Sequence, residues 1–232
     1  RHLIKATRLP VAEEARRHFA LRVYDLIQYE DLTYADRYIS QVQAICASDV
    51  PERHYAATCA AIYQLARLMA IKDEVYVAHL LTCEEKYRRD RVRYKIDPAR
   101  GDRIRYRHLN RPHLRLLGRD FRPNLKLGDR TLKTIARMRF LRRLCAAWWH
   151  REERDFLAWY EDLLGRFTYR NVDEHQTWVR VLSLPGEVRG YRDVRIPKME
   201  AAKSRAGELL AGRQPAADPT LLQIGDPEPI PP

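Results

Sequence analysis

The sequence lacks closely spaced cysteines and long apolar runs. Its four cysteines, Cys46, Cys59, Cys83 and Cys145, form no CxxC pair, which argues against a disulfide framework and against iron–sulfur ligation by this chain. Reduced, buried thiols in a cytoplasmic protein are the simplest interpretation. No apolar stretch approaches the roughly 18 residues that a membrane-spanning helix needs, so we expect no membrane partner.

Common motifs of catalysis and metal binding are also missing. The chain contains no GxSxG element, no P-loop and no GxGxxG followed by an acidic residue at the required distance. His79 and Cys83 stand four residues apart, a spacing that can hold zinc, but no second pair completes a site. We therefore predict no catalytic residue and no metal ligand, and the sequence identifies no cofactor-binding residue.

Positive charge is abundant and is concentrated in one segment. The formal net charge is +12, and residues 86–122 contain fourteen Lys or Arg against four Asp. An arginine-rich composition explains the choice of Arg over Lys, but it does not explain the clustering. We interpret residues 86–128, called the basic segment below, as a surface that meets an acidic partner.

Apolar periodicity predicts a mainly α-helical fold, with one domain over residues 1–213. Helices are expected over residues 11–45 with a break near Asp31, 52–89, 130–167, 172–184 and 198–213, with a loop or short extended piece over 186–197. The basic segment interrupts them with extended structure at about 97–128, including a β-hairpin with arms at Leu114–Leu116 and Leu125–Leu127. The tail, residues 214–232, carries six prolines and is expected to be disordered or draped over the domain.

Two groups of residues are candidates for contact with an anionic partner. They are Arg103, Arg105, Arg107, His108 and Arg111 in the basic segment, and Arg189, Tyr191, Arg192 and Arg195 near the last helix. Aromatic residues interleaved with Arg also suit single-stranded nucleic acid. No recognised nucleic-acid motif accompanies them, so we favour an acidic protein surface and keep a free-standing nucleic-acid-binding module as the alternative.

The triplet Lys72-Asp73-Glu74 interrupts an apolar run over residues 68–80. Three adjacent helical residues spread over about 200°, so they cannot share one face. On a continuous helix, Asp73 lies near the centre of the apolar stripe. Because an unpaired buried carboxylate costs several kcal/mol, Asp73 then needs an Arg or a helix-end amide as partner. We predict that Asp73 is a buried structural charge.

Four stretches, in the same order, resemble the helical C-terminal region of the large bacterial indolepyruvate (arylpyruvate) ferredoxin oxidoreductases. The stretches are YEDLTYADRY (29–38), LARLMAIKDEVYVAHLLT (65–82), YRHLNRP (106–112) and VRGYRDVRIPKMEAAKSR (188–205). They are similar to the family elements YQDxxYAxRY, KLMAYKDEYEVARLYT, HLxPP and IRGYGHVKxxNxxxAK. Asn110-Arg111 and Arg192 depart from these patterns.

The resemblance implies an enzyme complex that decarboxylates an aryl 2-oxoacid, transfers the acyl group to coenzyme A and reduces ferredoxin. This chain lacks the thiamine diphosphate signature, a GDG followed at a distance by NN, and it lacks cluster cysteines. The implied role is therefore an accessory domain that binds no cofactor itself. Thiamine diphosphate, magnesium and iron–sulfur clusters would lie in the thiamine and γ-type catalytic domains. Those domains, and ferredoxin, are its expected partners.

Overall fold

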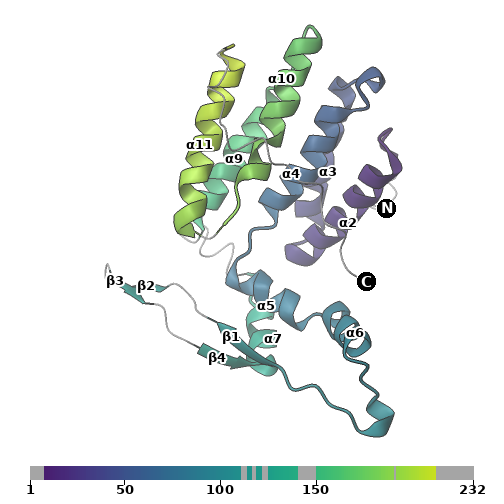
Figure 1. Cartoon of the computed structure of the whole chain (residues 1–232), viewed down its shortest axis with the longest axis vertical. Coiled ribbons are helices and arrows are strands. Elements are labelled where there is room, and N and C mark those ends of the chain that lie inside the picture. The colour runs from purple at the N-terminus through teal and green to yellow at the C-terminus, as the bar shows by residue number, and fades with distance from the viewer. Residues whose placement is uncertain are drawn as a thin grey trace.

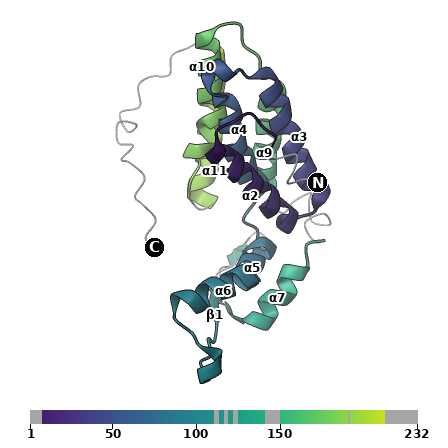
Figure 2. The same ribbon diagram turned by 90° about the vertical axis from the view of Figure 1, so that its right-hand side faces the viewer.

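The computed structural model describes residues 8–110, 114–116, 119–121, 125–140, 150–190 and 192–212. Within these residues the fold is mainly α-helical, as predicted, with two small antiparallel strand pairs. A helical bundle forms the upper part of the molecule in Figure 1, and a smaller lobe of helices and strands lies below it (Figures 1 and 2). The proline-rich tail falls outside the described residues.

The bundle consists of helices that surround a central one. Its helices are α2 (Glu13–Tyr29), α3 (Leu32–Ser48), α4 (Ala56–Met69), α9 (Arg151–Gly165), α10 (Val172–Ser183) and α11 (Arg192–Leu210), with short 3₁₀ turns at η1 (Pro51–Arg53) and η3 (Leu184–Glu187). Helix α4 packs against α2, α3, α9 and α10. Two fully buried tyrosines form hydrogen bonds through their hydroxyl groups. Tyr38 donates to the carbonyl of Ile62, and Tyr160 donates to that of Leu182, each at 2.8 Å.

The break predicted near Asp31 is confirmed. Helix α2 ends at Tyr29, and Asp31 is the N-cap of α3, where its side chain accepts a hydrogen bond from the backbone N–H of Tyr34 at 2.8 Å. An aspartate at this position satisfies one of the free amides of the new helix. The apolar pattern continues across the break, so both helices face one core.

The lobe contains the basic segment. Its elements are α5 (Glu74–Thr82), α6 (Glu84–Arg93), η2 (Pro98–Arg100), β1 (Arg107–Asn110), β2 (Leu114–Leu116), β3 (Arg119–Phe121), β4 (Leu125–Gly128) and α7 (Asp129–Arg137). Helix α5 packs along α7, and β1 pairs with β4 while β2 pairs with β3. The strand pairs extend sideways from α5 and α7, toward the left in Figure 1, with β2 and β3 the farther pair.

Some of the strand pairings and helix bounds predicted from the sequence are wrong. The arms of the expected hairpin are strands, but each pairs with another partner: Leu114 faces Phe121, and Leu125 faces Asn110. The single helix expected over 52–89 is interrupted at 70–73 and at Cys83. The segment expected to be a loop up to residue 197 is already helical from Arg192, and Pro197 lies inside α11.

Candidate functional site

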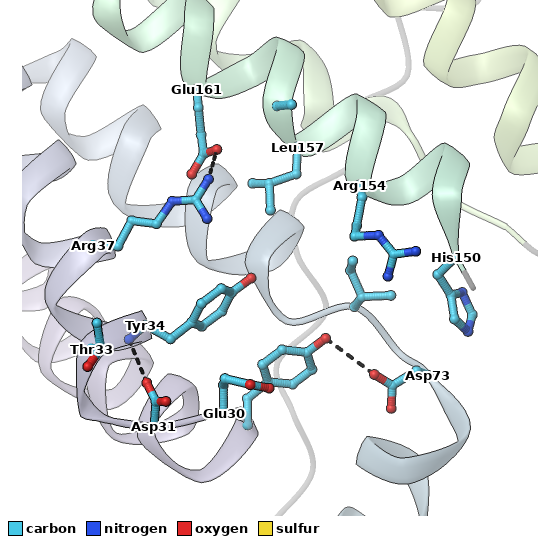
Figure 3. A pocket seen from close by; sticks show the side chains of 13 residues that line it. Glu30, Asp31, Thr33, Tyr34, Arg37, Asp73, His150, Arg154, Leu157 and Glu161 are labelled. Atoms are coloured by element: carbon cyan, nitrogen blue, oxygen red, sulfur yellow. Dashed lines mark hydrogen bonds and ion pairs between the residues drawn. The ribbon is translucent and has the colours of Figure 1, made fainter. Parts of the chain in front are cut away.

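The bundle and the lobe meet at Asp73, which is only 3% exposed. The chain leaves α4 at Met69, and Asp73 becomes the N-cap of α5, so the premise of a continuous helix is wrong. One carboxylate oxygen of Asp73 accepts from the backbone N–H of Tyr76 at 2.7 Å, and the other from the hydroxyl of Tyr29 at 3.3 Å (Figure 3). The buried charge is thus held by a helix-end amide and by a phenol at the end of α2.

Aromatic rings pack around this carboxylate. Tyr29 meets Tyr76 edge-to-face with ring centroids 5.0 Å apart, and both contact Ile71 in an apolar cluster separate from the bundle core. Tyr34 donates its hydroxyl to the carbonyl of Met69 at 3.1 Å. We call this arrangement the Asp73 joint. It brings residues 29–38 together with residues 65–82, two of the stretches that carry the family resemblance.

A cavity of about 530 Å³ lies beside the Asp73 joint. Its wall combines the Arg37–Glu161 ion pair, which links α3 to α9, with apolar side chains such as Leu157. Arg154 extends from α9 toward the side of the cavity where Asp73 lies (Figure 3). Its Nη2 is buried and has no hydrogen-bond partner in the part of the chain described. The cavity therefore combines an apolar wall with one unsatisfied guanidinium donor.

His150 connects the bundle to the lobe at the edge of this cavity. It precedes α9 with a left-handed backbone (φ 52°), and its two ring nitrogens lie 3.4 Å from Glu74 of α5 and 3.6 Å from Glu153 of α9. Burial lowers the pKa of His150, but the hydrogen bonds to Glu153 and Glu74 outweigh that effect and raise it to about 9. The imidazole is therefore charged at neutral pH.

This ion pair makes stability depend on pH. The folded pKa of His150 lies above the ordinary 6.5, so its contribution is complete below pH 6.5 and is lost as pH rises through 9. We expect the free energy of unfolding to fall by up to about 3 kcal/mol across that window. Urea unfolding from pH 6 to pH 9.5 measures it. The His150→Gln variant should lack this part of the slope, and a slope unchanged by the substitution would contradict the assignment.

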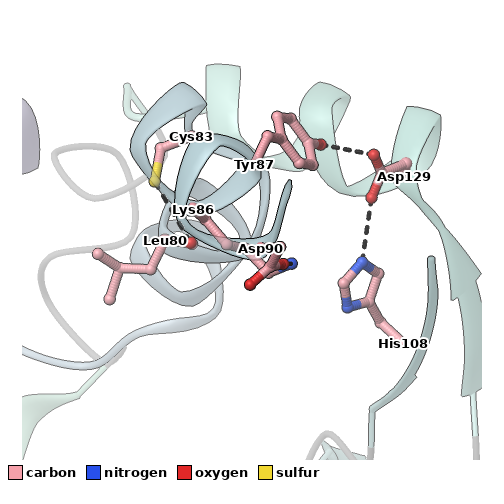
Figure 4. A network of polar contacts seen from close by, with 7 residues as sticks. All are labelled: Leu80, Cys83, Lys86, Tyr87, Asp90, His108 and Asp129. Atoms are coloured by element: carbon pink, nitrogen blue, oxygen red, sulfur yellow. Dashed lines mark hydrogen bonds and ion pairs between the residues drawn. The ribbon is translucent and has the colours of Figure 1, made fainter. Parts of the chain in front are cut away.

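A second polar network holds the strands of the lobe to its helices (Figure 4). Asp129, at the start of α7, accepts from the hydroxyl of Tyr87 at 2.5 Å and lies 3.1 Å from the Nε2 of His108. Lys86 pairs with Asp90 at 2.6 Å and sits over the ring of Tyr106. His108 was a candidate for partner contact, but it is engaged in this internal network.

The arginines of the basic segment form an exposed row. Arg103, Arg105 and Arg107 face solvent, whereas the residues between them are half-buried, so the alternation predicted from sequence holds for side-chain direction. Arg111 lies outside the described residues. The result is a row of exposed guanidinium groups. Tyr106, which lies between two of these arginines in the sequence, packs against Tyr87.

The second candidate group surrounds a residue that sequence reasoning missed. Arg67 of α4 donates to the carbonyls of Gly186 at 3.1 Å and Val188 at 2.6 Å. Arg189 is exposed and Arg195 half-buried. Tyr191 is outside the described residues, and only the backbone of Arg192 is described. No local pattern marks Arg67, because its partners lie about 120 residues away.

A buried pair of Asp49 and His175 was also missed. Their side chains are fully enclosed and lie 2.9 Å apart, although 126 residues separate them in sequence. The other oxygen of Asp49 accepts from both the backbone N–H and the hydroxyl of Thr58, each at 2.9 Å. Because no solvent reaches this pair, we assign it a structural role in joining α3, α4 and α10.

Within the described residues, no group of three or more His, Cys, Asp or Glu lies close enough to hold a metal ion. None of the helices described there is both long and apolar enough to cross a membrane.

Comparison with known proteins places the chain in one family. The model of a family described as "Family of unknown function (DUF6537)" matches residues 15–208, which span the bundle, the Asp73 joint and the lobe. The chain belongs to this family. The DUF6537 match treats the basic segment as part of the same unit as the helices. No curated protein and no solved structure matches the chain.

Proposed function

We propose that this DUF6537 chain is an accessory docking domain of a thiamine-diphosphate-dependent indolepyruvate-type 2-oxoacid:ferredoxin oxidoreductase. In this role the bundle packs against the catalytic domains, and the basic segment receives an acidic protein. Ferredoxins are commonly acidic, so ferredoxin is the specific partner we propose. The chain supplies no catalytic centre; thiamine diphosphate, magnesium and iron–sulfur clusters belong to the partner domains.

The observation that carries the docking proposal is the exposed row of Arg103, Arg105 and Arg107. No salt bridge to these three side chains occurs among the described residues. Their charge is therefore available to a partner, and such a row accelerates and orients association with an acidic surface. Assignment to the oxidoreductase rests on the resemblance, and two of its four stretches meet in the Asp73 joint.

The nucleic-acid alternative has weaker support. Binding of single strands relies on exposed aromatic rings on which bases stack. Tyr87 and Tyr106 instead pack together with ring centroids 5.3 Å apart, and their faces are covered by Lys86 and Lys133. Tyr94 is the exposed aromatic residue of α6 and its flank. The segment thus offers charge, but few stacking surfaces.

Charge reversal of the arginine row tests the proposal in the intact oxidoreductase complex. We expect the triple variant Arg103→Glu, Arg105→Glu, Arg107→Glu to raise the KM for ferredoxin at least about tenfold, because repulsion replaces attraction. Turnover with a small uncharged dye as electron acceptor should not change. The comparison of the two acceptors separates docking from catalysis.

A matched control comes from exposed arginines of the bundle. The triple variant Arg17→Glu, Arg166→Glu, Arg170→Glu changes the net charge by the same amount on another surface. Its KM for ferredoxin should stay close to that of the natural protein. If both triple variants raise this KM equally, or if neither does, the basic segment is not the docking surface. Tight, salt-sensitive binding of single-stranded RNA by the natural chain would instead favour the alternative.

A further inference from the structure

Three guanidinium groups gather where α4 ends and α11 begins. Arg67 and Arg189 both donate to one carbonyl oxygen, that of Gly186, at 3.1 and 3.3 Å. Arg195 lies in the first turn of α11. The pKa of Arg67 is lowered by burial and by the nearby charges of Arg195 and Arg189. The three positive charges are therefore close enough to repel one another. We call this group the arginine cluster.

Within the described residues, no carboxylate forms an ion pair with the arginine cluster. Two described acidic side chains in this region have other partners: Glu187 pairs with Arg205 at 3.1 Å, and Glu153 lies 3.6 Å from His150. Arg195 lowers the pKa of Glu153, but only as the last of several causes. The Nε of Arg195 is buried without a hydrogen-bond partner. Like charges held close together repel one another in the empty protein, and such arrangements are typical of binding sites.

The backbone beside the arginine cluster adds to its positive potential. Gly190 adopts φ +113°, a conformation that other residues rarely adopt, and a Cβ at this position would lie 3.1 Å from Val194. This turn starts the nineteen-residue helix α11. The first turn of α11 carries Arg195, so the positive end of the dipole of this helix lies next to the guanidinium groups.

We propose that Arg67, Arg189 and Arg195 form a binding site for the phosphate group of a small molecule. Guanidinium forks match the geometry of phosphate oxygens, and three cations favour a multiply charged anion over a single carboxylate. Arg67 is fixed by its two carbonyl partners, so it positions the site, whereas Arg189 and Arg195 supply the donors that reach the anion. This site is separate from the arginine row, and the docking role does not require it.

Isothermal titration calorimetry of the full chain with inorganic phosphate, pyrophosphate and acetate, in about 0.15 M NaCl, tests this site. We expect saturable binding of pyrophosphate at least about tenfold tighter than binding of acetate. The double variant Arg189→Gln, Arg195→Gln should weaken pyrophosphate binding at least about tenfold. The matched control Arg103→Gln, Arg105→Gln removes the same charge from the arginine row and should leave the affinity unchanged.

The two phosphate ligands also distinguish the source of the anion. Binding of inorganic phosphate with the affinity of pyrophosphate points to free phosphate, and a clear preference for pyrophosphate points to a larger phosphate compound. The proposal would be overturned if both double variants weakened pyrophosphate binding equally. It would also be overturned if the natural chain bound acetate as tightly as pyrophosphate. Because Arg189 is exposed, Arg189→Gln alone keeps the fold and should still weaken binding if Arg195→Gln impairs folding. The ligand-free Arg189→Gln protein should melt at a higher temperature, because repulsion is relieved.

Discussion

Replacing Asp49 with alanine should lower the free energy of unfolding by about 3–5 kcal/mol, because several buried polar groups lose the carboxylate that they contact. The carboxylate of Asp49 pairs with His175 and accepts two hydrogen bonds from Thr58. After the substitution, these groups stay buried without a partner. Since the whole domain is stabilised by only about 5–15 kcal/mol, this loss is a large fraction of its stability.

Urea unfolding followed by circular dichroism measures the effect of Asp49→Ala. Asp155→Ala is the matched control, because Asp155 is an exposed aspartate on α9 that pairs only with Arg151 at 3.6 Å. We expect the control to change stability by less than about 0.5 kcal/mol. Similar losses in the two variants would contradict a structural role for the buried pair.

Replacing Asp73 with alanine should cost about 2–4 kcal/mol, since a helix cap and a buried hydrogen bond are lost together. The variant leaves the Tyr76 amide and the Tyr29 hydroxyl without the carboxylate they bond. Urea unfolding followed by circular dichroism measures this loss. Local unfolding should increase most where the lobe meets the bundle. Amide hydrogen exchange should therefore accelerate more in α5 than in α4.

Asp31→Ala provides a matched comparison for Asp73→Ala. Asp31 is also an N-cap aspartate, and it accepts from the Tyr34 amide at 2.8 Å, but it is more exposed than Asp73. Loss of this cap should cost about 1 kcal/mol. The excess cost at Asp73 then measures what the Asp73 joint adds to simple capping. If the two variants cost the same, the contact with Tyr29 adds no stability.

Local patterns in the sequence predict the helices and the exposure of the arginine row. The break at Asp31 follows from aspartate as a capping residue, and the period of two over residues 103–107 predicts which side chains face solvent. The burial of Asp73 is also predicted from the apolar stripe. The structural reason for this burial differs from the predicted one, because α4 ends at Met69 and Asp73 caps the next helix, α5.

Features that depend on contacts between distant segments could not be predicted in the same way. No glycine or proline lies between Pro51 and Pro98, so the one local signal for the interruption at residues 70–73 is Asp73 as a capping residue, and the continuous apolar pattern around it favours an unbroken helix. The strand partners of β1–β4 depend on how the basic segment folds back on itself. Asp49 and His175 are 126 residues apart, and their pairing is determined by the packing of α3 and α10 on α4, not by spacing.

The Asp73 joint gives the docking proposal a physical basis. It fixes the start of α5, and α5 packs along α7 in the lobe that contains the basic segment. His150 adds an ion pair between α9 and α5 beside it. These contacts tie the lobe to the bundle, so in the proposed docking role they would set the orientation of the arginine row relative to the bundle.

The dependence of the ferredoxin KM on salt, measured in the proposed oxidoreductase complex, tests the proposed docking role most directly. Charge-driven association weakens as ions screen the two surfaces. We predict that the KM for ferredoxin rises steeply between about 0.05 and 0.3 M NaCl, while turnover with a small uncharged acceptor stays constant. In the triple variant of Arg103, Arg105 and Arg107, the KM should no longer rise with salt. A ferredoxin KM for the natural complex that does not change with salt would contradict the docking role.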